Sequence, residues 1–391
     1  MAMPAKAKET LYNPLAISIG FFFVFFGFGG AQQFLSVFLK HAGFKSLGII
    51  SLLLLYSVYL AVNSYAPTII AWFGSPRRSL IAGAATYAIF PIGAALSSPP
   101  VIIICSVLIG VGASLLWVSA DRIIAHVSSD NIGRGYGLEV SGALGGSAAG
   151  IFSGGFIAAL WGEQMFFLIM VLVTTCGTML LLRVLDVELP NMTASHHAQI
   201  WKQGALRYSI LAIMAASFLA AIGFTALSLR LADVFGVVWV GPVGAVLKLG
   251  SVFGIMFATF NLSPRRYPAI LIFALCAMAV SAYMFSTSIG LTASLVTALC
   301  LGASGALVQP LTMSTLRRSY PAEALLGVIS GYYVWTTGSV VLGISMNLLL
   351  DPVWCFRIGA VLSLLAIPGI VMILKDQQRI GTWKEEVILS R

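Results

Sequence analysis

The sequence predicts an all-α membrane protein with 12 transmembrane helices, built as two six-helix pseudo-repeats. Three observations lead to this prediction: the composition, a succession of long apolar runs, and the placement of the basic residues. Hydrophobic residues make up 59% of the 391 residues and charged residues only 9%, whereas about a quarter of an ordinary soluble domain is charged. This composition excludes a soluble enzyme, a disordered chain and, despite a net charge of +9, a nucleic-acid-binding module.

The apolar runs give the helices in order. A spanning helix needs roughly 20 mostly apolar residues. Helices suit such runs because, in lipid, every backbone polar group must find its partner inside the protein. We predict spans at residues 14–39, 47–73, 79–97, 100–125, 136–160, 164–186, 207–232, 236–260, 267–289, 290–316, 325–350 and 353–374.

The basic residues fix the predicted orientation. If the N-terminus is cytoplasmic, all but five of the 22 Lys and Arg residues fall on the cytoplasmic side of the membrane. The five exceptions are Lys40, Lys45, Arg230, Lys248 and Arg357. Cytoplasmic loops carry an excess of Lys and Arg, so the sequence predicts that both termini are cytoplasmic.

An internal repeat divides the chain into two halves. The segment Ser-Pro-Arg-Arg at 75–78 recurs at 263–266, and Gly-Ala-Ser at 112–114 recurs at 302–304, with nearly the same offset. We predict a six-helix half at 1–186, a cytoplasmic linker at 187–206, a second six-helix half at 207–374 and a cytoplasmic tail at 375–391. A 6+6 arrangement with such a linker is the architecture of the major facilitator superfamily, whose cavity lies between the halves near the bilayer midplane.

Lys248 is the sharpest candidate for a functional residue. It lies about mid-way along the eighth span, on a face of small and polar residues that includes Gly241, Gly244 and Ser251. Ionisable groups inside spans are costly and mark functional sites by default. Lys248 is therefore either a cationic contact for an anionic substrate, a lysine that exchanges a proton, or a structural lysine paired with a carboxylate on another helix.

The fourth span has one continuous polar face. Ser106, Gly110, Ser114, Trp117 and Asp121 follow one another at steps of three and four residues, which places them on one side of a helix. Trp117 is a candidate to stack on a ligand, and Asp121 is a candidate to carry a proton. In the alternative interpretation, Trp117 fills a helix crossing and Asp121 belongs to a charge cluster at the cytoplasmic end; we favour this alternative for Asp121.

Two ion pairs are expected near the ends of spans. Arg122 ends the fourth span and Glu139 begins the fifth, and the loop between them returns the chain, so we expect an ion pair that acts as a structural clamp or a gate. Arg230 and Asp233 stand three residues apart at the outer end of the seventh span. Residues at this spacing are neighbours on a helix, so we expect a local pair.

Three amides interrupt apolar spans. Gln32 and Gln33 lie in the first span, and Gln309 stands before Pro310 in the tenth. These amides either bind a substrate or bridge helices, and Pro310 is expected to kink its helix beside the cavity. Tyr332, Tyr333 and Trp335 open the eleventh span, where aromatic residues usually form an interfacial belt.

The fifth span carries a stripe of glycines: Gly142, Gly145, Gly146, Gly150, Gly154 and Gly155. Such spacing lets two helices approach closely in a membrane. We therefore expect this span to lie close against a neighbour, a structural feature that indicates no substrate.

Signatures of enzymes and cofactors are missing from the sequence. We find no Gly-rich phosphate loop, no HExxH motif and no nucleophile elbow. His196 and His197 stand together in the predicted linker, but two histidines without further ligands indicate a solvated segment more than a metal site. We predict that the chain is not an enzyme and binds no cofactor or metal.

Several segments of the first half resemble one branch of the major facilitator superfamily, the Unc-ninety-three-like ("uncoordinated") branch. The similar segments are Ala-Gln-Gln-Phe-Leu-Ser at 31–36, Leu-Gly-Ile-Ile-Ser-Leu at 47–52, Gly-Ser-Pro-Arg-Arg-Ser-Leu at 74–80, Gly-Val-Gly-Ala-Ser-Leu-Leu-Trp at 110–117 and Gly-Arg-Gly-Tyr-Gly at 133–137. Beyond these segments, the sequence shows only the general fold.

The loop after the second span departs from the pattern of the superfamily. Gly74, Arg77 and Arg78 match its cytoplasmic loop signature, but Ala71 and Trp72 stand where the general signature carries an Asp-Arg pair. The usual charge lock of this loop is therefore in doubt. The fifth span also lacks the Gly-Pro step of drug antiporters, which lowers multidrug export as an interpretation.

The resemblance implies two classes of function. Some animal members of the branch act as partners of other membrane proteins, whereas plant and microbial members are usually taken as transporters. The compact chain favours a secondary active transporter for a small anionic or zwitterionic solute, working by alternating access with protons as the coupling ion. We expect a monomer in a bacterial inner membrane; the alternative is a non-transporting membrane partner.

Overall fold

The computed structural model confirms an all-α architecture. It describes residues 5–44, 46–63, 65–127, 132–187, 204–261, 266–287, 290–319 and 322–389, and these contain helices and turns but no strand. The helices are α1 (Ala5–His41), α2 (Leu47–Asn63), α3 (Ala66–Trp72), α4 (Pro76–Ala95), α5 (Pro99–Val127), α6 (Ile132–Leu181), α8 (Gly204–Phe224), α9 (Ala226–Phe235), α10 (Val237–Asn261), α11 (Tyr267–Thr287), α12 (Leu291–Ser319), α13 (Ala322–Leu349) and α14 (Pro352–Leu389).

These helices correspond to the 12 predicted spans once three breaks are taken into account. The long helix α6 is two spans, because Gly162 has φ 84° and ψ 164° and turns the chain back. Conversely, α2 and α3 together form the second span, and α8 and α9 the seventh. The seventh breaks at Thr225, whose hydroxyl donates to the carbonyl oxygen of Ala221 over 2.8 Å.

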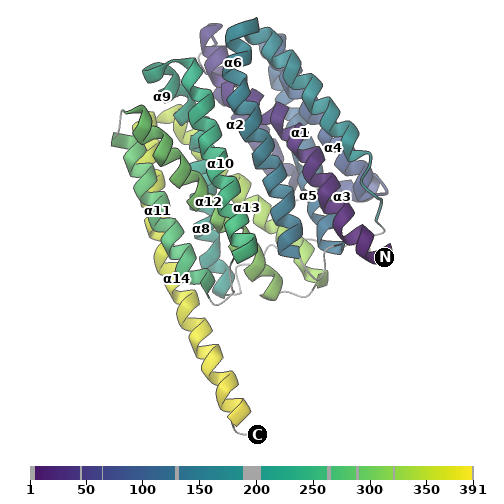
Figure 1. Cartoon of the computed structure of the whole chain (residues 1–391), viewed down its shortest axis with the longest axis vertical. Coiled ribbons are helices and arrows are strands. Elements are labelled where there is room, and N and C mark those ends of the chain that lie inside the picture. The colour runs from purple at the N-terminus through teal and green to yellow at the C-terminus, as the bar shows by residue number, and fades with distance from the viewer. Residues whose placement is uncertain are drawn as a thin grey trace.

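Eight helices of the described part of the chain are long and apolar enough to cross a membrane. The 17-residue helix α2 is a shorter apolar helix. Two boundaries differ most from the sequence prediction. Helix α1 begins at Ala5, whereas we predicted that its span starts at residue 14, and α14 continues to Leu389, whereas we predicted that its span ends at residue 374. Figure 1 shows this last part of α14 extending beyond the bundle.

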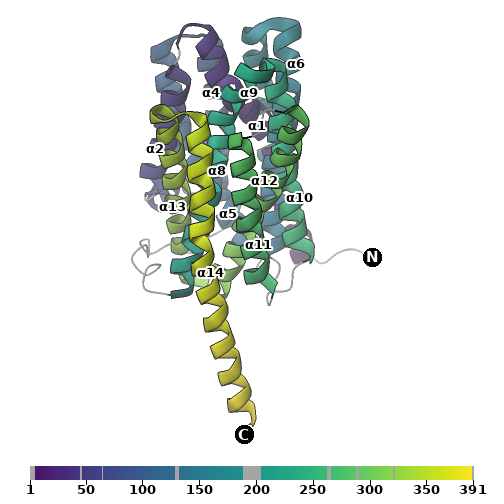
Figure 2. The same cartoon turned by 90° about the vertical axis from the view of Figure 1, so that its left-hand side faces the viewer.

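The two halves of the chain lie side by side. In Figure 1, α1 to α6, coloured purple to teal, lie mainly to the right, and α9 to α14, coloured green to yellow, lie to the left. The halves meet along two seams, α6 with α10 and α2 with α13. Figure 2 shows these seams on opposite sides of the bundle, and both views place the two ends of the chain at the same end of it, as an even number of spans requires.

Glycines of α6 bring this helix against the backbone of α1. A Cβ atom at Gly146 would collide with the carbonyl oxygen of Phe22, and one at Gly150 would collide with that of Phe26. Gly145, next along the chain, has more room, since its nearest neighbours lie 3.8 Å away on the Phe22 ring. The glycine stripe therefore packs as the sequence predicts.

The seam between α6 and α10 is also built from small residues. A Cβ atom at Gly241 would lie 2.9 Å from the carbonyl oxygen of Ile151, and one at Gly155 would lie 3.3 Å from the carbonyl oxygen of Val238. Gly244 faces the Ile151 side chain and the Gln33 amide at similarly short distances. Backbone therefore lies against backbone where the two halves meet.

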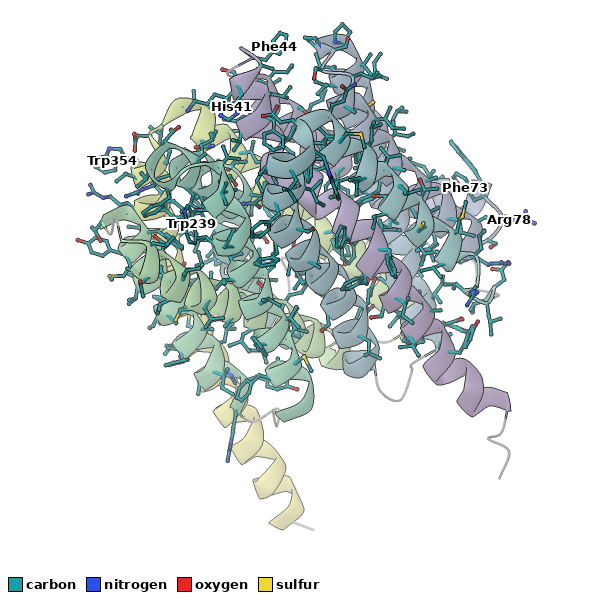
Figure 3. The ribbon with its side chains drawn as sticks, turned by 45° about the horizontal axis from the view of Figure 1, so that its top comes forward. His41, Phe44, Phe73, Arg78, Trp239 and Trp354 are labelled. Carbon is teal, nitrogen blue, oxygen red and sulfur yellow. The ribbon has the colours of Figure 1, made fainter. Side chains whose placement is uncertain are left out.

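An ion pair joins the halves at the end of the bundle opposite the chain ends. The Lys40 Nζ atom lies 2.7 Å from Asp233 Oδ1, and the two side chains are 36% and 60% exposed. The predicted pair between Arg230 and Asp233 is wrong, because Asp233 turns to the lysine of α1 instead. Figure 3 shows His41, the next residue, and Phe44 at this end, away from Phe73 and Arg78.

Part of the predicted internal organisation lies outside the described residues. Most of the predicted linker 187–206, with His196 and His197, is not described, and neither is most of the second Ser-Pro-Arg-Arg segment at 263–266. The two Gly-Ala-Ser segments are described, and both occur at close helix contacts. A Cβ atom at Gly112 would collide with Thr86 of α4, and one at Gly302 would collide with the Leu247 carbonyl oxygen of α10.

Candidate functional site

A central cavity of about 310 Å³ lies between the two halves. Helices α1, α2, α4, α5 and α6 line it from the N-terminal half, and α8, α10, α11, α12 and α13 line it from the C-terminal half. Eight of the described lining residues are aromatic: Phe25, Phe28, Tyr56, Tyr59, Tyr87, Trp117, Phe224 and Tyr332. The cavity therefore has the size and the mostly apolar character of a small-molecule site.

Lys248 is the one charged residue in the described lining of this cavity. Its helix α10 turns a small-residue face to α6, where Gly241 and Gly244 meet Ile151, and this places Lys248 at the cavity wall. The side chain is half-buried and forms no ion pair with a described residue, since the described ion pairs are Lys40 with Asp233 and His41 with Glu163. A structural pairing with a carboxylate thus has no support here.

Trp117 belongs to the cavity wall and to an aromatic cluster at the same time. Its ring centroid lies 5.2 Å from that of Phe21, with the planes nearly perpendicular, and 5.2 Å from that of Phe25. Such edge-on and tilted contacts are favourable between aromatic rings. The cluster holds the indole in place at the cavity wall.

Gln32 reaches the cavity with its amide held by a tyrosine. Its Nε2 atom donates to the Tyr56 hydroxyl over 2.8 Å. Tyr56 in turn stacks on Phe224 of α8, with ring centroids 5.7 Å apart and planes 19° from parallel. The Gln32–Tyr56–Phe224 chain therefore runs from the first half to the second along the cavity wall.

Gln33 does not line the cavity, although the sequence suggested it as a substrate contact. Its Nε2 atom donates to Ser228 Oγ over 2.6 Å and to the Gly223 carbonyl oxygen over 3.3 Å, and the side chain is buried. Because α1 turns by about 100° per residue, neighbouring glutamines point in different directions. Gln33 thus bridges helices of the two halves, the other role that the sequence left open.

Gln309 lines the central cavity from α12, as the sequence suggested. Pro310 follows it inside the helix and has no N–H, so the carbonyl group of Ala306 loses its usual helical partner. Ala306 also lines the cavity. The proline therefore leaves a backbone carbonyl near the ligand space.

Asp121 and Glu139 lie together in the protein interior. They are 1% and 0% exposed, and the two carboxyl groups are within hydrogen-bonding reach of each other. Both oxygens of Glu139 and the Oδ2 atom of Asp121 have no hydrogen-bond partner among the described residues. Asp121 thus makes no ion pair with a described cation, and the described contacts do not support its favoured interpretation as part of a charge cluster at the cytoplasmic end.

The predicted ion pair between Arg122 and Glu139 is also wrong. Arg122 is 6% exposed and makes no ion pair with any residue that the structure describes. Glu139 faces Asp121 instead, because consecutive residues of α5 point to different sides of the helix. Arg122 therefore does not neutralise either buried carboxyl group.

Tyr332 and Tyr333 are interior residues and not part of an interfacial belt. They are 5% and 6% exposed. Tyr332 lines the central cavity, whereas Tyr333 lies against Asp121 and lines a separate cavity of about 20 Å³. The belt prediction fails for them because α13 is packed between α2 and α8, away from lipid on this face.

Comparison with known proteins identifies the family. Residues 17–346 match the sequence profile of the Major Facilitator Superfamily. The chain belongs to this superfamily. It is therefore an integral, multi-pass membrane protein, and membership also supports the prediction that it is not an enzyme.

Relatives with UNC93-like names confirm the predicted resemblance to the Unc-ninety-three-like branch over part of the chain. UNC93-like protein MFSD11 of Xenopus tropicalis is 32% identical over 138 residues, which are 34% of this chain and 30% of that protein. UNC93-like protein 3 of Arabidopsis thaliana is 28% identical over 150 residues, 38% of this chain and 30% of that protein. The matched segments thus span less than a third of either relative's length.

A solved structure shares the fold over nearly the whole chain. The human organic anion transporter MFSD10 (TETRAN) superposes with a TM-score of 0.69, covering 94% of this chain and 100% of that chain. The two sequences are 13% identical. The likeness therefore shows the major facilitator fold and nothing finer.

The cytoplasmic loop signature of the superfamily is held here without its usual aspartate. Arg77 donates to the Leu182 carbonyl oxygen over 2.5 Å, and the Ser75 hydroxyl donates to Asp186 Oδ1 over 2.7 Å. Gly74 turns the chain with φ 70°, and Arg78 is exposed, as Figure 3 shows. These contacts attach the loop to the end of α6.

Three residues that make contacts described above were not identified from the sequence. Ser228 was one more serine in an apolar span, and nothing local marks it as the partner of an amide 195 residues earlier. Asp186 follows the sixth span on the same membrane face as the loop arginines, and that shared face was an available signal. Tyr333 was assigned to an interfacial belt only because it lies near the start of its span.

Proposed function

We propose that this chain is a secondary active transporter that moves a small organic anion through the central cavity by alternating access. Lys248, charged and without an ion-pair partner in the described part of the chain, carries the proposal. An ionised group inside a membrane protein is expensive unless it is paired or hydrated. A negatively charged ligand would supply the partner that the protein itself does not offer there.

The cavity lining favours an anion with an apolar or aromatic body. Apolar side chains, aliphatic and aromatic, make up most of the wall. Besides Lys248, the polar side chains of the described lining are neutral: the amides of Gln32 and Gln309 and the hydroxyls of serine, threonine and tyrosine residues. A zwitterion would also need a group that binds its cationic end, and the described lining contains no Asp or Glu. We therefore place an aromatic or aliphatic monocarboxylate ahead of an amino acid.

The arrangement of the halves supports alternating access. The cavity lies between two six-helix units that meet along the α6–α10 and α2–α13 seams. Lys40 with Asp233 and Gln33 with Ser228 join the units at the end opposite the chain ends. Rocking of one unit against the other would break these contacts and open that end, as in other transporters built from repeats.

Ligand binding to the purified protein tests this proposal. We would screen aromatic and aliphatic monocarboxylates, with benzoate as the first probe, for a rise in the unfolding temperature in detergent. A ligand at a hundred times its dissociation constant stabilises the fold by about 2.7 kcal/mol. Lys248→Ala should abolish that rise, whereas the control Arg183→Ala, which removes an exposed cation outside the cavity, should preserve it.

The same experiment distinguishes the competing function, a non-transporting membrane partner. Counterflow of labelled benzoate, or of whichever monocarboxylate the screen identifies, would follow in proteoliposomes. A ligand that binds through Lys248 and exchanges across the membrane supports transport. The absence of both binding and exchange for every acid in the screen would overturn the proposed organic-anion transporter in favour of the partner protein.

Orientation and location complete the proposal. Both termini are proposed to be cytoplasmic, on the strength of the Lys and Arg distribution, and the protein is proposed to act as a monomer. The bacterial inner membrane stays a prediction; the relatives described above come from an amphibian and a plant.

A further inference from the structure

The contact between Asp121 and Glu139 brings two acceptor groups together. Asp121 lies near the end of α5 and Glu139 near the start of α6, and their carboxyl groups are within hydrogen-bonding reach. Two ionised carboxylates have no proton to donate to each other. One shared proton turns the same contact into a hydrogen bond.

Among the side chains that the structure describes, none of the groups that face this carboxyl pair is a cation. Asp121 is faced by Tyr59 of α2 and by Tyr332 and Tyr333 of α13, all neutral phenols. Tyr136 of α6 donates to the backbone oxygen of Asp121 over 3.4 Å. Like charges in contact in a buried site do not stay ionised together. Because none of the described groups supplies a counter-ion, the described surroundings favour a shared proton.

The space beside the pair is too small and too apolar for a hydrated metal ion. Asp121, Gln309 and Tyr333 share the wall of the cavity of about 20 Å³ with Val140 and Ile255. That volume holds about one water molecule. Hard cations such as Mg²⁺ take about six oxygen ligands, which this site does not offer.

The small cavity and the central cavity share a wall. Gln309, Val140 and Ile255 line both of them. On α13, Tyr332 lines the central cavity while its neighbour Tyr333 lines the small one. Single side chains thus separate the cavity beside the carboxyl pair from the ligand space.

We propose that Asp121 and Glu139 form one proton-binding site, and that this site couples proton movement to the rocking of the two halves. The inference rests on the proposed transport function for its coupling part. The pair belongs to the first half, whereas Tyr333 and Gln309, which cover it, belong to the second. Separation of the halves at the end where the chain ends lie would expose the pair to water.

The coupling follows from the cost of an uncompensated charge. When the halves cover the pair, a proton stays shared between the two carboxyl groups. When they separate, water solvates the negative charge, and the proton leaves to bulk water without any covalent change in the protein. Loss of the proton therefore favours the separated arrangement, and binding of a proton favours the covered one.

Infrared spectroscopy of the protein in lipid vesicles tests the proton site without any substrate. Wild type should show the C=O band of a protonated carboxyl group at neutral pH, and the band should disappear as pH rises. Asp121→Asn with Glu139→Gln should remove it, whereas the control Glu163→Gln, which removes an exposed glutamate, should leave it. A band that is absent from wild type, or that survives the double substitution, overturns the proposal.

Two further experiments test whether the infrared band belongs to a proton on this carboxyl pair. If the double variant does not fold, the single substitutions decide, because each should move the midpoint of the band's titration while Glu163→Gln does not. The titration is also repeated with sodium chloride in place of choline chloride. A midpoint that moves with sodium shows competition by a metal ion and overturns the assignment to a proton.

The coupling part is measured with benzoate in proteoliposomes. Glu139→Gln should keep counterflow exchange but lose accumulation driven by a pH gradient, and Glu163→Gln should keep both. If accumulation persists in Glu139→Gln, the pair is not the coupling site. If wild type exchanges no benzoate, this substrate of the proposed function fails, while the infrared result still decides whether the pair holds a proton.

Discussion

The Gln33 side chain of the first span bonds to Ser228 of the seventh, with 2.6 Å between Nε2 and Oγ. The two residues are buried and belong to different halves of the molecule. This contact, together with the second bond of Gln33 to the Gly223 carbonyl oxygen, is a direct polar link across the bundle.

Replacing Gln33 should weaken the link between the halves. Gln33→Ala leaves the Ser228 hydroxyl and the Gly223 carbonyl group buried without that partner, and we expect a loss of about 1–3 kcal/mol in the free energy of unfolding. A double-mutant cycle with Ser228→Ala, followed by thermal unfolding, measures the coupling between the two side chains. Strictly additive effects of the two substitutions would show that the contact contributes nothing.

The ion pair between Lys40 and Asp233 should matter much less for stability. Both side chains are substantially exposed, and exposed pairs contribute roughly 0–1 kcal/mol. We expect Asp233→Asn to change the unfolding temperature little, and any change to shrink as salt is added. A large, salt-independent loss of stability would mean that the pair is desolvated and carries more of the contact than its exposure indicates.

The contact between α1 and α6 offers a matched pair of glycine substitutions. Gly146→Ala places a methyl group against the Phe22 carbonyl oxygen and should cost about 1–3 kcal/mol through overpacking. Gly145→Ala meets only ring atoms of Phe22 at 3.8 Å and should be tolerated. Unfolding curves of the two variants in one detergent decide the matter, and equal effects would contradict the close approach at Gly146.

Lys248 should lower the stability of the ligand-free protein. An apolar side chain of similar length removes an uncompensated charge, so Lys248→Met is expected to stabilise the ligand-free protein by about 1 kcal/mol. The same variant should no longer respond to monocarboxylates. The unfolding temperature without ligand provides the measurement, and a destabilised Lys248→Met would indicate that the ammonium group has a partner inside the fold.

The fold was largely predictable because lipid imposes it. Each span needs an apolar run of fixed minimum length, and such runs are visible without knowledge of any tertiary contact. The breaks were less visible. Thr225 gives no strong local signal that α8 ends there. The structure shows why the break is tolerated: the Thr225 hydroxyl donates to the Ala221 carbonyl oxygen, because the Thr225 backbone N–H bonds to Ile222 instead.

The candidate site was only partly predictable, for a different reason. Lys248, Trp117, Gln32 and Gln309 were found because polar or bulky residues on a small-residue face point away from lipid. The contact partners of the polar residues were not found, because they depend on how each helix is rotated and on contacts between distant segments. Arg122 was paired with Glu139 from proximity in the chain, whereas the rotation of α5 presents Asp121 to it.

The seam between α6 and α10 has a kinetic consequence. Gly155, Gly241 and Gly244 set backbone against backbone there, so few side chains interlock across the contact. In the proposed alternating access, one half would slide past the other with little change of rotamer. The activation barrier would then lie in bonds at the ends of the bundle, such as that of Gln33 with Ser228. A larger side chain at any of the three glycines should slow interconversion before it alters ligand affinity.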